Sequence, residues 1–217
     1  MTNRQPIQKQ EKDTLTLFLS GIAKFGKAHL RGIVTAVVIL ALLATLAIVD
    51  AEHKKKVKEN SWAAYYKAQL AVAQDPAAVA QLDEVTGKFA GTQAAQYAQL
   101  LKGDVLYAGE NYAQAADAYE PLLNAKNQTV RTVATLSLGA TRQAMQDYDG
   151  AIKLMTAFIQ NNPTSFALPQ AYFTLAMSQE LAGKTAEATE TYKQILANYT
   201  KTYFGTVAKD KLAALNK

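Results

Sequence analysis

An uninterrupted apolar run near the N-terminus divides the chain into two parts with different hydrophobic patterns. From Ile33 to Val49 no residue is charged, and Thr35 and Thr45 are the only polar side chains. As a helix this run would be roughly 26 Å long, close to the hydrocarbon thickness of a bilayer, about 30 Å. A helix in the core of a soluble protein normally keeps a polar face. The pattern therefore predicts a transmembrane helix over residues 32–50.

The segment before this run, residues 1–31, has apolar positions at helical spacing. They are Leu15, Phe18, Leu19, Ile22 and Phe25. This predicts a juxtamembrane segment that either lies as an amphipathic helix in the headgroup region or only extends the anchor. Its mixed charge and the lack of a good cleavage motif favour an uncleaved anchor over a signal peptide. After the run, the lysine-rich residues 51–60 are expected to form a basic juxtamembrane linker.

Beyond residue 60 the pattern is helical, and it repeats every 36 or 37 residues. Small residues recur at Gly103, Gly139 and Ala176, alanines follow at Ala115, Ala151 and Ala188, and larger side chains come next at Tyr119, Met155 and Tyr192. Two helices per unit explain these offsets. A small residue in the first helix lets the second helix approach, and the large side chain one turn later fills the remaining space. This part of the chain is therefore predicted to be all-α.

Turn-forming residues give the bounds of the units. Gly109-Glu110-Asn111 and Ala182-Gly183-Lys184 fall inside units, whereas Asn161-Asn162-Pro163 lies between two units. The predicted domain covers residues 61–217. It comprises a degenerate helix pair at 61–90, repeats at about 96–127, 132–163 and 169–200, and a capping helix at 201–215 that covers the end of the stack.

This pattern resembles the tetratricopeptide repeat, whose helix pairs stack into a right-handed superhelix. The residues that carry the resemblance are Gly103, Ala115 and Tyr119 in the first unit, Leu138-Gly139, Ala151 and Pro163 in the second, and Leu175-Ala176, Gly183, Ala188 and Tyr192 in the third. The resemblance implies an α-solenoid of helical hairpins that follows the transmembrane helix. It also implies a module for protein–protein interaction.

The positive charge of the chain lies beside the apolar run. Residues 1–49 carry a net charge of +4 and residues 50–58 a net charge of +2, whereas the remainder carries −1. Lysine and arginine near the run fit anionic lipid headgroups. The repeat domain has no excess of basic residues for phosphate groups, so nucleic acid is not an expected partner. Within twenty residues of the run four basic residues precede it and five follow, so the charges alone do not set its orientation.

No motif in the sequence predicts catalysis. The chain has no cysteine, and its two histidines, His29 and His53, flank the apolar run. It has no glycine-rich phosphate loop, no nucleophile elbow and no set of acids at metal-ligand spacing. We therefore expect no enzyme activity, no catalytic or metal site and no cofactor, and we interpret the domain as a protein-binding surface.

In tetratricopeptide stacks the first helix of each pair lines the concave face, and the resemblance carries this over by position. The predicted groove comprises Tyr97, Leu100, Asp104 and Tyr107 in the first unit, Val133, Leu136 and Gln143 in the second, and Phe173, Met177, Glu180 and Leu181 in the third. Mostly apolar and aromatic, this set suits adaptable contacts with hydrophobic or unfolded segments. The alternative is that these side chains are buried between repeats or under a terminal helix.

The order of parts resembles the ancillary subunit of the bacterial Sec translocon. The residues that carry this resemblance are Phe18 and Gly26-Lys27 before the run, and Leu82-Asp83-Glu84-Val85 through Tyr119 in the domain. It implies a single-pass inner-membrane protein with a cytoplasmic N-terminus and a periplasmic repeat domain. Its implied partners are the Sec translocon, exported chains and periplasmic chaperones. The Lys54-Lys55-Lys56 cluster departs from what that orientation leads us to expect.

A second interpretation is a membrane-tethered scaffold for envelope assembly or cell division. Such a scaffold would bind a folded partner at fixed stoichiometry or associate with itself. A translocon accessory protein would instead make weak contacts with many different chains. The sequence leaves both interpretations open.

Overall fold

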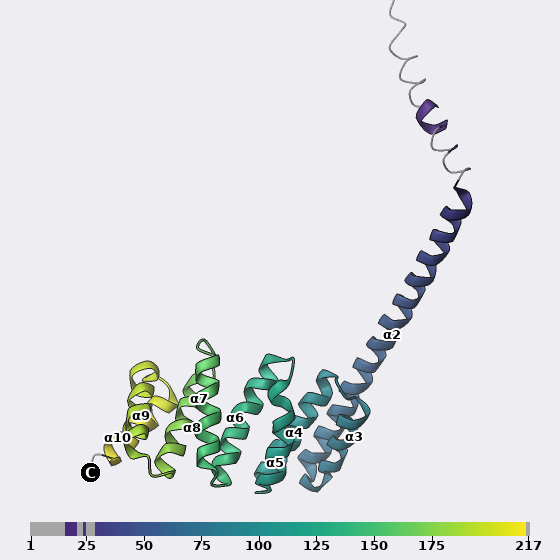
Figure 1. Cartoon of the computed structure of the whole chain (residues 1–217). Coiled ribbons are helices and arrows are strands. Elements are labelled where there is room, and N and C mark those ends of the chain that lie inside the picture. Colours follow the sequence, from purple (N-terminus) through teal and green to yellow (C-terminus); the bar gives the residue numbers. More distant parts are fainter. Residues whose placement is uncertain (1–15, 21–23, 25–28, 216–217) are drawn as a thin grey trace, which may run out of the picture. The chain divides into compact units, whose positions relative to one another are not determined.

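The computed structural model describes residues 16–20, 24 and 29–215, which are largely helical (Figure 1). The chain divides into two compact units, residues 1–56 and 57–217. In the first unit, residues 16–20 form a helical turn on which Phe18 and Leu19 are exposed. The other positions of the predicted N-terminal stripe, Leu15, Ile22 and Phe25, lie outside the described residues.

Helix α2 (Leu30–Gln74) contains the apolar run. By length and composition, it is the helix among the described residues that is long and apolar enough to cross a membrane. The Thr35 and Thr45 hydroxyls donate hydrogen bonds of 2.8 and 2.9 Å to carbonyls of the same helix. Neither hydroxyl would therefore be left without a partner in hydrocarbon, where such a group costs several kcal/mol.

The basic segment 51–60, expected to be a linker, is helical and belongs to α2. No glycine or proline occurs between Ile33 and Asp75, so nothing in this stretch interrupts the helix. Pro76 ends it, because a residue that precedes proline avoids the helical conformation. Asp75 is accordingly extended, with φ −143° and ψ 109°, and its side chain caps the next short helix.

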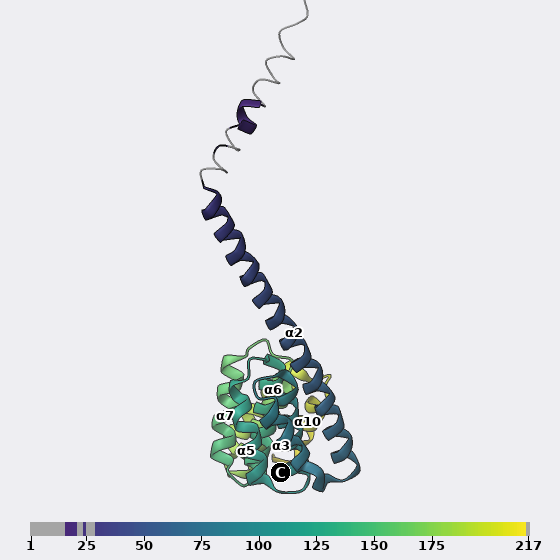
Figure 2. The ribbon, with the colours of Figure 1, turned by 90° about the vertical axis from the view of Figure 1, so that its right-hand side faces the viewer.

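The second unit is a stack of helix pairs, as the repeat pattern predicts. After residues 57–74 of α2, its elements are η1 (Pro76–Val79), α3 (Ala80–Lys88), α4 (Gln93–Ala108), α5 (Tyr112–Tyr119), η2 (Glu120–Asn124), α6 (Gln128–Ala144), α7 (Tyr148–Asn161), α8 (Leu168–Leu181), α9 (Thr185–Tyr199) and α10 (Tyr203–Leu215). Figure 1 shows the pairs side by side in chain order, and Figure 2 views them along the stack. The all-α solenoid is confirmed.

The first helices of consecutive pairs touch one another. Helix α4 contacts α6, α6 contacts α8, and α8 contacts α10. Among the described residues, no contact joins the second helices α5 and α7, or α7 and α9. Because the first helices are spaced more closely, their side of the stack is the concave one.

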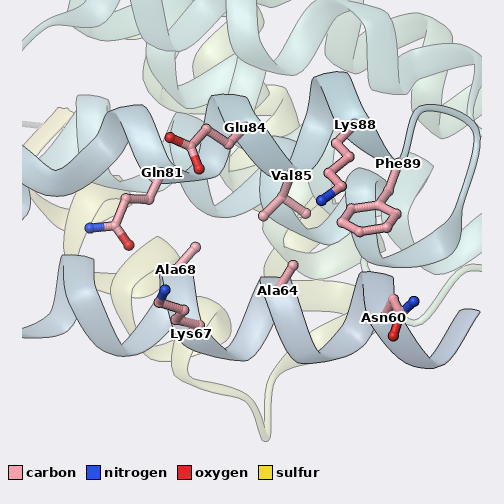
Figure 3. Close-up of a pocket in the computed structure, with 9 residues that line it drawn as sticks. All are labelled: Asn60, Ala64, Lys67, Ala68, Gln81, Glu84, Val85, Lys88 and Phe89. Carbon is pink, nitrogen blue, oxygen red and sulfur yellow. The ribbon is translucent and has the colours of Figure 1, made fainter. Parts of the chain in front are cut away.

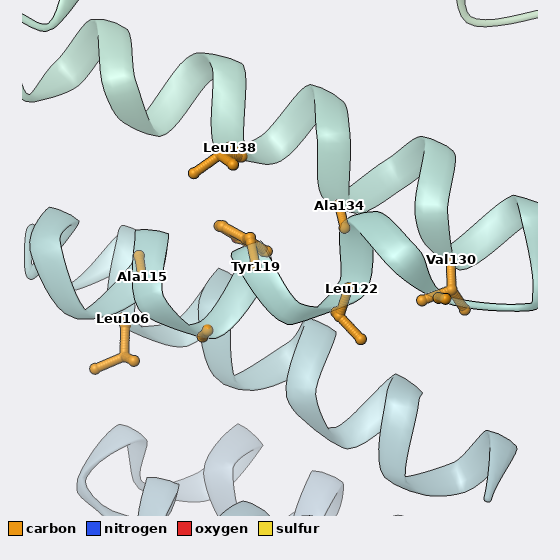
Figure 4. Close-up of a cluster of buried hydrophobic side chains, with 9 residues drawn as sticks. Leu106, Ala115, Tyr119, Leu122, Val130, Ala134 and Leu138 are labelled. Carbon is orange, nitrogen blue, oxygen red and sulfur yellow. The ribbon is translucent and has the colours of Figure 1, made fainter. Parts of the chain in front are cut away.

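Within a pair, a large side chain of the second helix lies on a small residue of the first. A Cβ atom on Gly103 would come within 2.6 Å of Cζ of Tyr119, and one on Gly139 within 2.6 Å of the methyl carbon of Met155. Tyr119 and Met155 are almost completely buried. Figure 4 shows Tyr119 between Ala115 and Leu138, in a core that links neighbouring repeats. The packing expected from the repeat is confirmed.

The turns after α4, α6 and α8 close with the same backbone hydrogen bonds. The N–H of Asn111 donates to the carbonyl of Leu106, the N–H of Asp147 to that of Arg142, and the N–H of Lys184 to that of Gln179, at 2.8–2.9 Å. This is the Schellman pattern, which needs one residue with positive φ. In the three turns this residue is Glu110 (φ 60°), Gln146 (φ 64°) and Gly183 (φ 74°). Two of the three turns thus hold a non-glycine residue in the left-handed region.

The two buried glycines should respond differently to alanine. Gly103→Ala sets a methyl group against the rigid ring of Tyr119, whereas Gly139→Ala meets the flexible end of Met155. Overpacking costs about 1–3 kcal/mol and alanine regains about 1 kcal/mol of helix propensity. We expect Gly103→Ala to lower the free energy of unfolding by about 1–2 kcal/mol and Gly139→Ala by less, measured by urea unfolding of the full chain in detergent. Equal stability of the two variants would contradict this assignment.

Candidate functional site

The predicted groove residues of the first repeat lie against helix α2 and the repeat core. The Tyr97 ring is half-buried, with its centroid 5.6 Å from that of Trp62 and 6.3 Å from that of Tyr65. Leu100 packs against the core around Tyr119. Both side chains therefore join consecutive helix pairs and present only part of their surface to solvent.

In the second repeat the predicted residues also lie at the junction with the next pair. Leu136 is 5% exposed and belongs to a core that it shares with Met155 and Leu175. Nε2 of Gln143 donates a hydrogen bond of 3.3 Å to the hydroxyl of Ser178 on α8. Val133 is half-buried. Leu136 has almost no surface with which to contact a partner.

In the third repeat, helix α10 covers most of the predicted residues. The Phe173 ring centroid lies 5.5 Å from that of Phe204, and Met177 packs in the same cluster. Glu180 accepts hydrogen bonds from the Tyr192 hydroxyl at 2.8 Å and from Nζ of Lys211 at 2.9 Å. Helix α10 thus occupies the position that the first helix of a further repeat would take.

The two acids of the predicted groove are bound by tyrosines of the second helices. The Tyr119 hydroxyl donates to Oδ1 of Asp104 at 2.6 Å, as Tyr192 does to Glu180. Burial raises the pKa of Asp104, and the hydrogen bond from Tyr119 partly opposes that rise. Burial and then the neighbouring carboxylates raise the pKa values of Tyr119 and Tyr192. Both acids join the two helices of a pair. Glu180 is also paired with Lys211, whereas Asp104 remains exposed.

Of the apolar predicted residues, Tyr107 and Leu181 remain 38% and 49% exposed near the C-terminal ends of α4 and α8. The equivalent ends of α6 and α2 carry Met145, 44% exposed, and Leu70, 61% exposed. Because first helices run in the same direction through the stack, these four side chains lie at the same rim of it. Tyr107, Met145 and Leu181 come four, six and five residues after Gly103, Gly139 and Ala176, so they leave their helices in different directions. We call Leu70, Tyr107, Met145 and Leu181 the apolar row.

Leu70 and Met145 were not among the predicted site residues. The sequence contains a signal for them, because successive members of the apolar row are 37, 38 and 36 residues apart, close to the repeat length. Met145 was missed because it follows the last residue of α6, in the turn. Leu70 was missed because the degenerate first pair was not given groove positions.

A cleft of about 310 Å³ lies between α2 and α3 (Figure 3). Ala64 and Ala68 of α2 and Val85 of α3 form its apolar surface, whereas Lys67 and Glu84 bring opposite charges to its lining. Such a cleft can take an apolar side chain of a partner and pair its polar neighbours. It contains no arrangement of an acid, a base and a nucleophile.

The side chains described give no indication of metal binding or catalysis. No group of three or more histidines, aspartates or glutamates in the described ranges could hold a metal ion. In the same ranges, every fully enclosed polar side-chain atom has a hydrogen-bond partner. The geometry offers contact surfaces, among them the apolar row and the cleft between α2 and α3.

Comparisons with known proteins agree with this architecture. The family model of the tetratricopeptide repeat-like domain matches residues 24–167, and a tetratricopeptide repeat model matches residues 170–202. Two crystal structures of nearly identical repeats from a Podosopora anserina protein named as a kinesin light chain have similar folds. One is of a variant with a single substitution. It has a TM-score of 0.57 at 16% identity, and the match covers 75% of this chain and 86% of that chain. The other has a TM-score of 0.55 at 18% identity and covers 74% and 85%.

At such low identity the likeness to these structures shows the fold alone. No curated protein matches the chain.

The buried tyrosine–carboxylate pairs predict a loss of stability in alkali. A tyrosine in an unfolded chain titrates near pH 10. Because the folded-state pKa of Tyr119 is raised, its contribution is complete below about pH 10 and is lost as the pH rises towards the folded value. We expect the free energy of unfolding to fall above about pH 10, and to fall less steeply in Tyr119→Phe. Urea unfolding at several pH values, followed by circular dichroism, measures this slope.

The matched control is Tyr203→Phe, because the Tyr203 side chain is 73% exposed. It should reproduce the alkaline slope of the unmodified chain. A slope in Tyr119→Phe as steep as in this control would mean that the buried tyrosine does not contribute to the alkaline loss.

Proposed function

The chain belongs to the tetratricopeptide repeat-like domain family, and from this premise we propose that it is a membrane-anchored module that binds partner proteins through its apolar row. Repeats of this kind indicate protein partners, and the fold is typically a non-catalytic scaffold. The observation that carries the proposal is the recurrence of one exposed large apolar side chain near the C-terminal end of each of four successive first helices.

The apolar row is suited to an extended or helical segment that lies across several repeats. A soluble surface keeps single apolar residues without consequence, but a regular series along one edge marks an interaction surface. Tyrosine and methionine adapt to differently shaped partners, because one has an amphipathic ring and the other a flexible chain. Of the remaining predicted groove residues, the exposed Asp104 and the half-buried Tyr97, Leu100, Val133 and Gln143 add surface on the first helices to the proposed contact surface. Phe173, Met177 and Glu180 pack against α10.

We further propose that residues 32–50 of α2 anchor the protein in a bacterial inner membrane. The exposed apolar window of α2 supports this, and so does the family match, which begins at residue 24 and so includes the window with the repeats. In the proposed orientation the N-terminus is cytoplasmic and the repeats are periplasmic. Lysines close to the span on the repeat side are compatible with anionic headgroups on that leaflet.

The specific role that we propose is that of an accessory protein of the Sec translocon. Its repeats would receive exported chains and help to pass them to periplasmic chaperones. The support is the resemblance in the order of parts, together with an apolar row that suits unfolded segments. A tethered scaffold for envelope assembly or cell division would use the same row for one folded partner or for a second copy.

The proposed orientation predicts the activity of reporters fused after Lys217. Alkaline phosphatase folds outside the cytoplasm, whereas a suitable fluorescent protein matures only inside it. We expect phosphatase activity and no fluorescence from cells that produce the respective fusions. Fluorescence without phosphatase activity would place the repeats in the cytoplasm and overturn the translocon proposal.

The apolar row predicts which side chains contact partners. In the variant Tyr107→Ser/Met145→Ser/Leu181→Ser we expect crosslinking of partner proteins in native membranes to fall by at least about fivefold, because apolar contact area is lost. Stability should change by less than about 1 kcal/mol, since exposed residues contribute little to folding. Crosslinking of the full chain, followed by mass spectrometry, gives the partners and their amounts.

Tyr203→Ser is the matched control, because it removes an exposed apolar side chain outside the row. Translocon subunits and a range of exported chains among the products would support the accessory role. One stoichiometric partner, or the chain itself, would favour the scaffold. Unchanged crosslinking in the triple variant would show that partners bind elsewhere.

A further inference from the structure

A second cleft, of about 470 Å³, lies where the α7–α8 loop meets the beginning of α6. It is lined by Gln128, Thr129 and Thr132 from α6, by Asn161 from the end of α7, and by Asn162, Pro163, Thr164, Ser165 and Phe166 from the loop. None of these residues belongs to the apolar row or to the predicted groove. Its volume is within the range of small-molecule sites, about 300–1,000 Å³.

The lining of this cleft is polar but carries no charge. Amide and hydroxyl side chains dominate it, and no lysine, arginine, aspartate or glutamate contributes. A metal ion or an organic cation would find no carboxylate there, and a phosphate would find no basic side chain. The helix start does not attract an anion either, because Asn127 accepts hydrogen bonds from the backbone N–H groups of Thr129 and Val130.

Most of these polar side chains are not used by the protein itself. Within the described part of the chain, no hydrogen bond engages the side chains of Gln128, Thr129, Thr132, Asn161 or Thr164. Thr132 is only 5% exposed. Because every fully enclosed polar atom in that part of the chain has a partner, the Thr132 hydroxyl keeps some exposed surface, and Thr132 lines the cleft. The cleft therefore offers one partly desolvated hydroxyl, together with the exposed side chains of Gln128, Thr129, Asn161 and Thr164.

Phe166 adds an aromatic surface beside these groups. Its side chain is 78% exposed, more than any other phenylalanine of the repeat domain. The loop that carries it is fixed by its own hydrogen bonds: Ser165 N–H donates to the Asn162 carbonyl at 3.0 Å, and Ala167 N–H donates to the Ser165 hydroxyl at 3.2 Å. An exposed ring on a hydrogen-bonded loop offers a surface on which a flat apolar face can stack.

We propose that this cleft binds a neutral saccharide. A pyranose ring presents hydroxyl groups around its edge, which amides and hydroxyls can bind, and C–H groups on its face, which can stack on Phe166. A saccharide therefore provides both hydrogen-bonding groups and a stacking face without any charge, and the lining of the cleft carries no charge either. A capped peptide in an extended conformation is the rival, because its backbone also exchanges hydrogen bonds with amides. This site is independent of the proposed protein-binding function and of the apolar row.

The test uses the full chain in a zwitterionic detergent without a sugar head group, since a glucoside or maltoside would compete. The ligands are maltotriose, cellotriose and the trimer of N-acetylglucosamine, and binding is measured by titration calorimetry and by saturation-transfer NMR. We expect saturable binding of at least one of them at low millimolar concentration or below. A capped Asn- and Ser-containing hexapeptide is titrated in parallel.

Two variants locate the binding. Phe166→Ala removes the stacking surface, and Thr132→Val replaces the hydroxyl by a methyl group of similar size; each should weaken saccharide binding by at least about tenfold. Tyr203→Ala, which also removes an exposed ring, should leave it unchanged. Thermal unfolding by circular dichroism identifies any variant that fails to fold, and Asn161→Ala then takes its place.

Three results would overturn the proposal. One is that none of the three saccharides binds at concentrations up to about 20 mM, well above the weak limit of about 1 mM that still corresponds to a free energy of about −4 kcal/mol. Another is binding that survives Phe166→Ala and its companion variant, which would place the saccharide elsewhere. The third is tighter binding of the hexapeptide at the same cleft. None of these results bears on the crosslinking test of the apolar row.

Discussion

The contact between a large side chain of each second helix and a small residue of the preceding first helix determines most of the structure. It brings the two helices of a pair so close that the tyrosine or methionine has no exposed surface left. The same side chain reaches the next first helix, since Tyr119 packs with Leu138 as well. Pair formation and stacking therefore depend on one set of contacts. Where the large residue is a tyrosine, its hydroxyl also donates a hydrogen bond to an acid of the first helix.

The repeat could be predicted from sequence because these contacts are local and recur at a fixed spacing. The all-α class, the pairing of helices and the role of Gly103 and Tyr119 follow from that spacing. The groove could be predicted only in part. Whether Tyr97 or Phe173 faces solvent depends on how closely the next first helix approaches, and that distance is set by side chains from a different repeat. Offsets within a single unit contain no information about it.

At both ends of the stack the structure differs from the prediction made from the sequence. A helix at the C-terminal end was predicted, and burial of groove residues under it was left open; the structure shows Phe204 against Phe173, and an ion pair of Lys211 with Glu180 that was not predicted. At the other end, α2 continues through the lysine-rich segment because no residue there interrupts a helix. The packing of α10 depends on which side chains of the last repeat it meets, and the continuation of α2 depends on whether any residue interrupts the helix. Composition shows neither. The neutral cleft beside Phe166 was missed because its residues come from the start of α6 and from the α7–α8 junction, about 30 residues apart, and show no period.

The turns that follow the first helices have a consequence for how this sequence can change. Two of the three hold a non-glycine residue, Glu110 or Gln146, at positive φ, which costs roughly 1 kcal/mol or more for such a residue. The third already has glycine at the same place. Glycine at Glu110 or Gln146 would relieve this cost. The chain can therefore accept mildly destabilising substitutions elsewhere and compensate for them at these turns, which lie close to Tyr107 and Met145 of the apolar row.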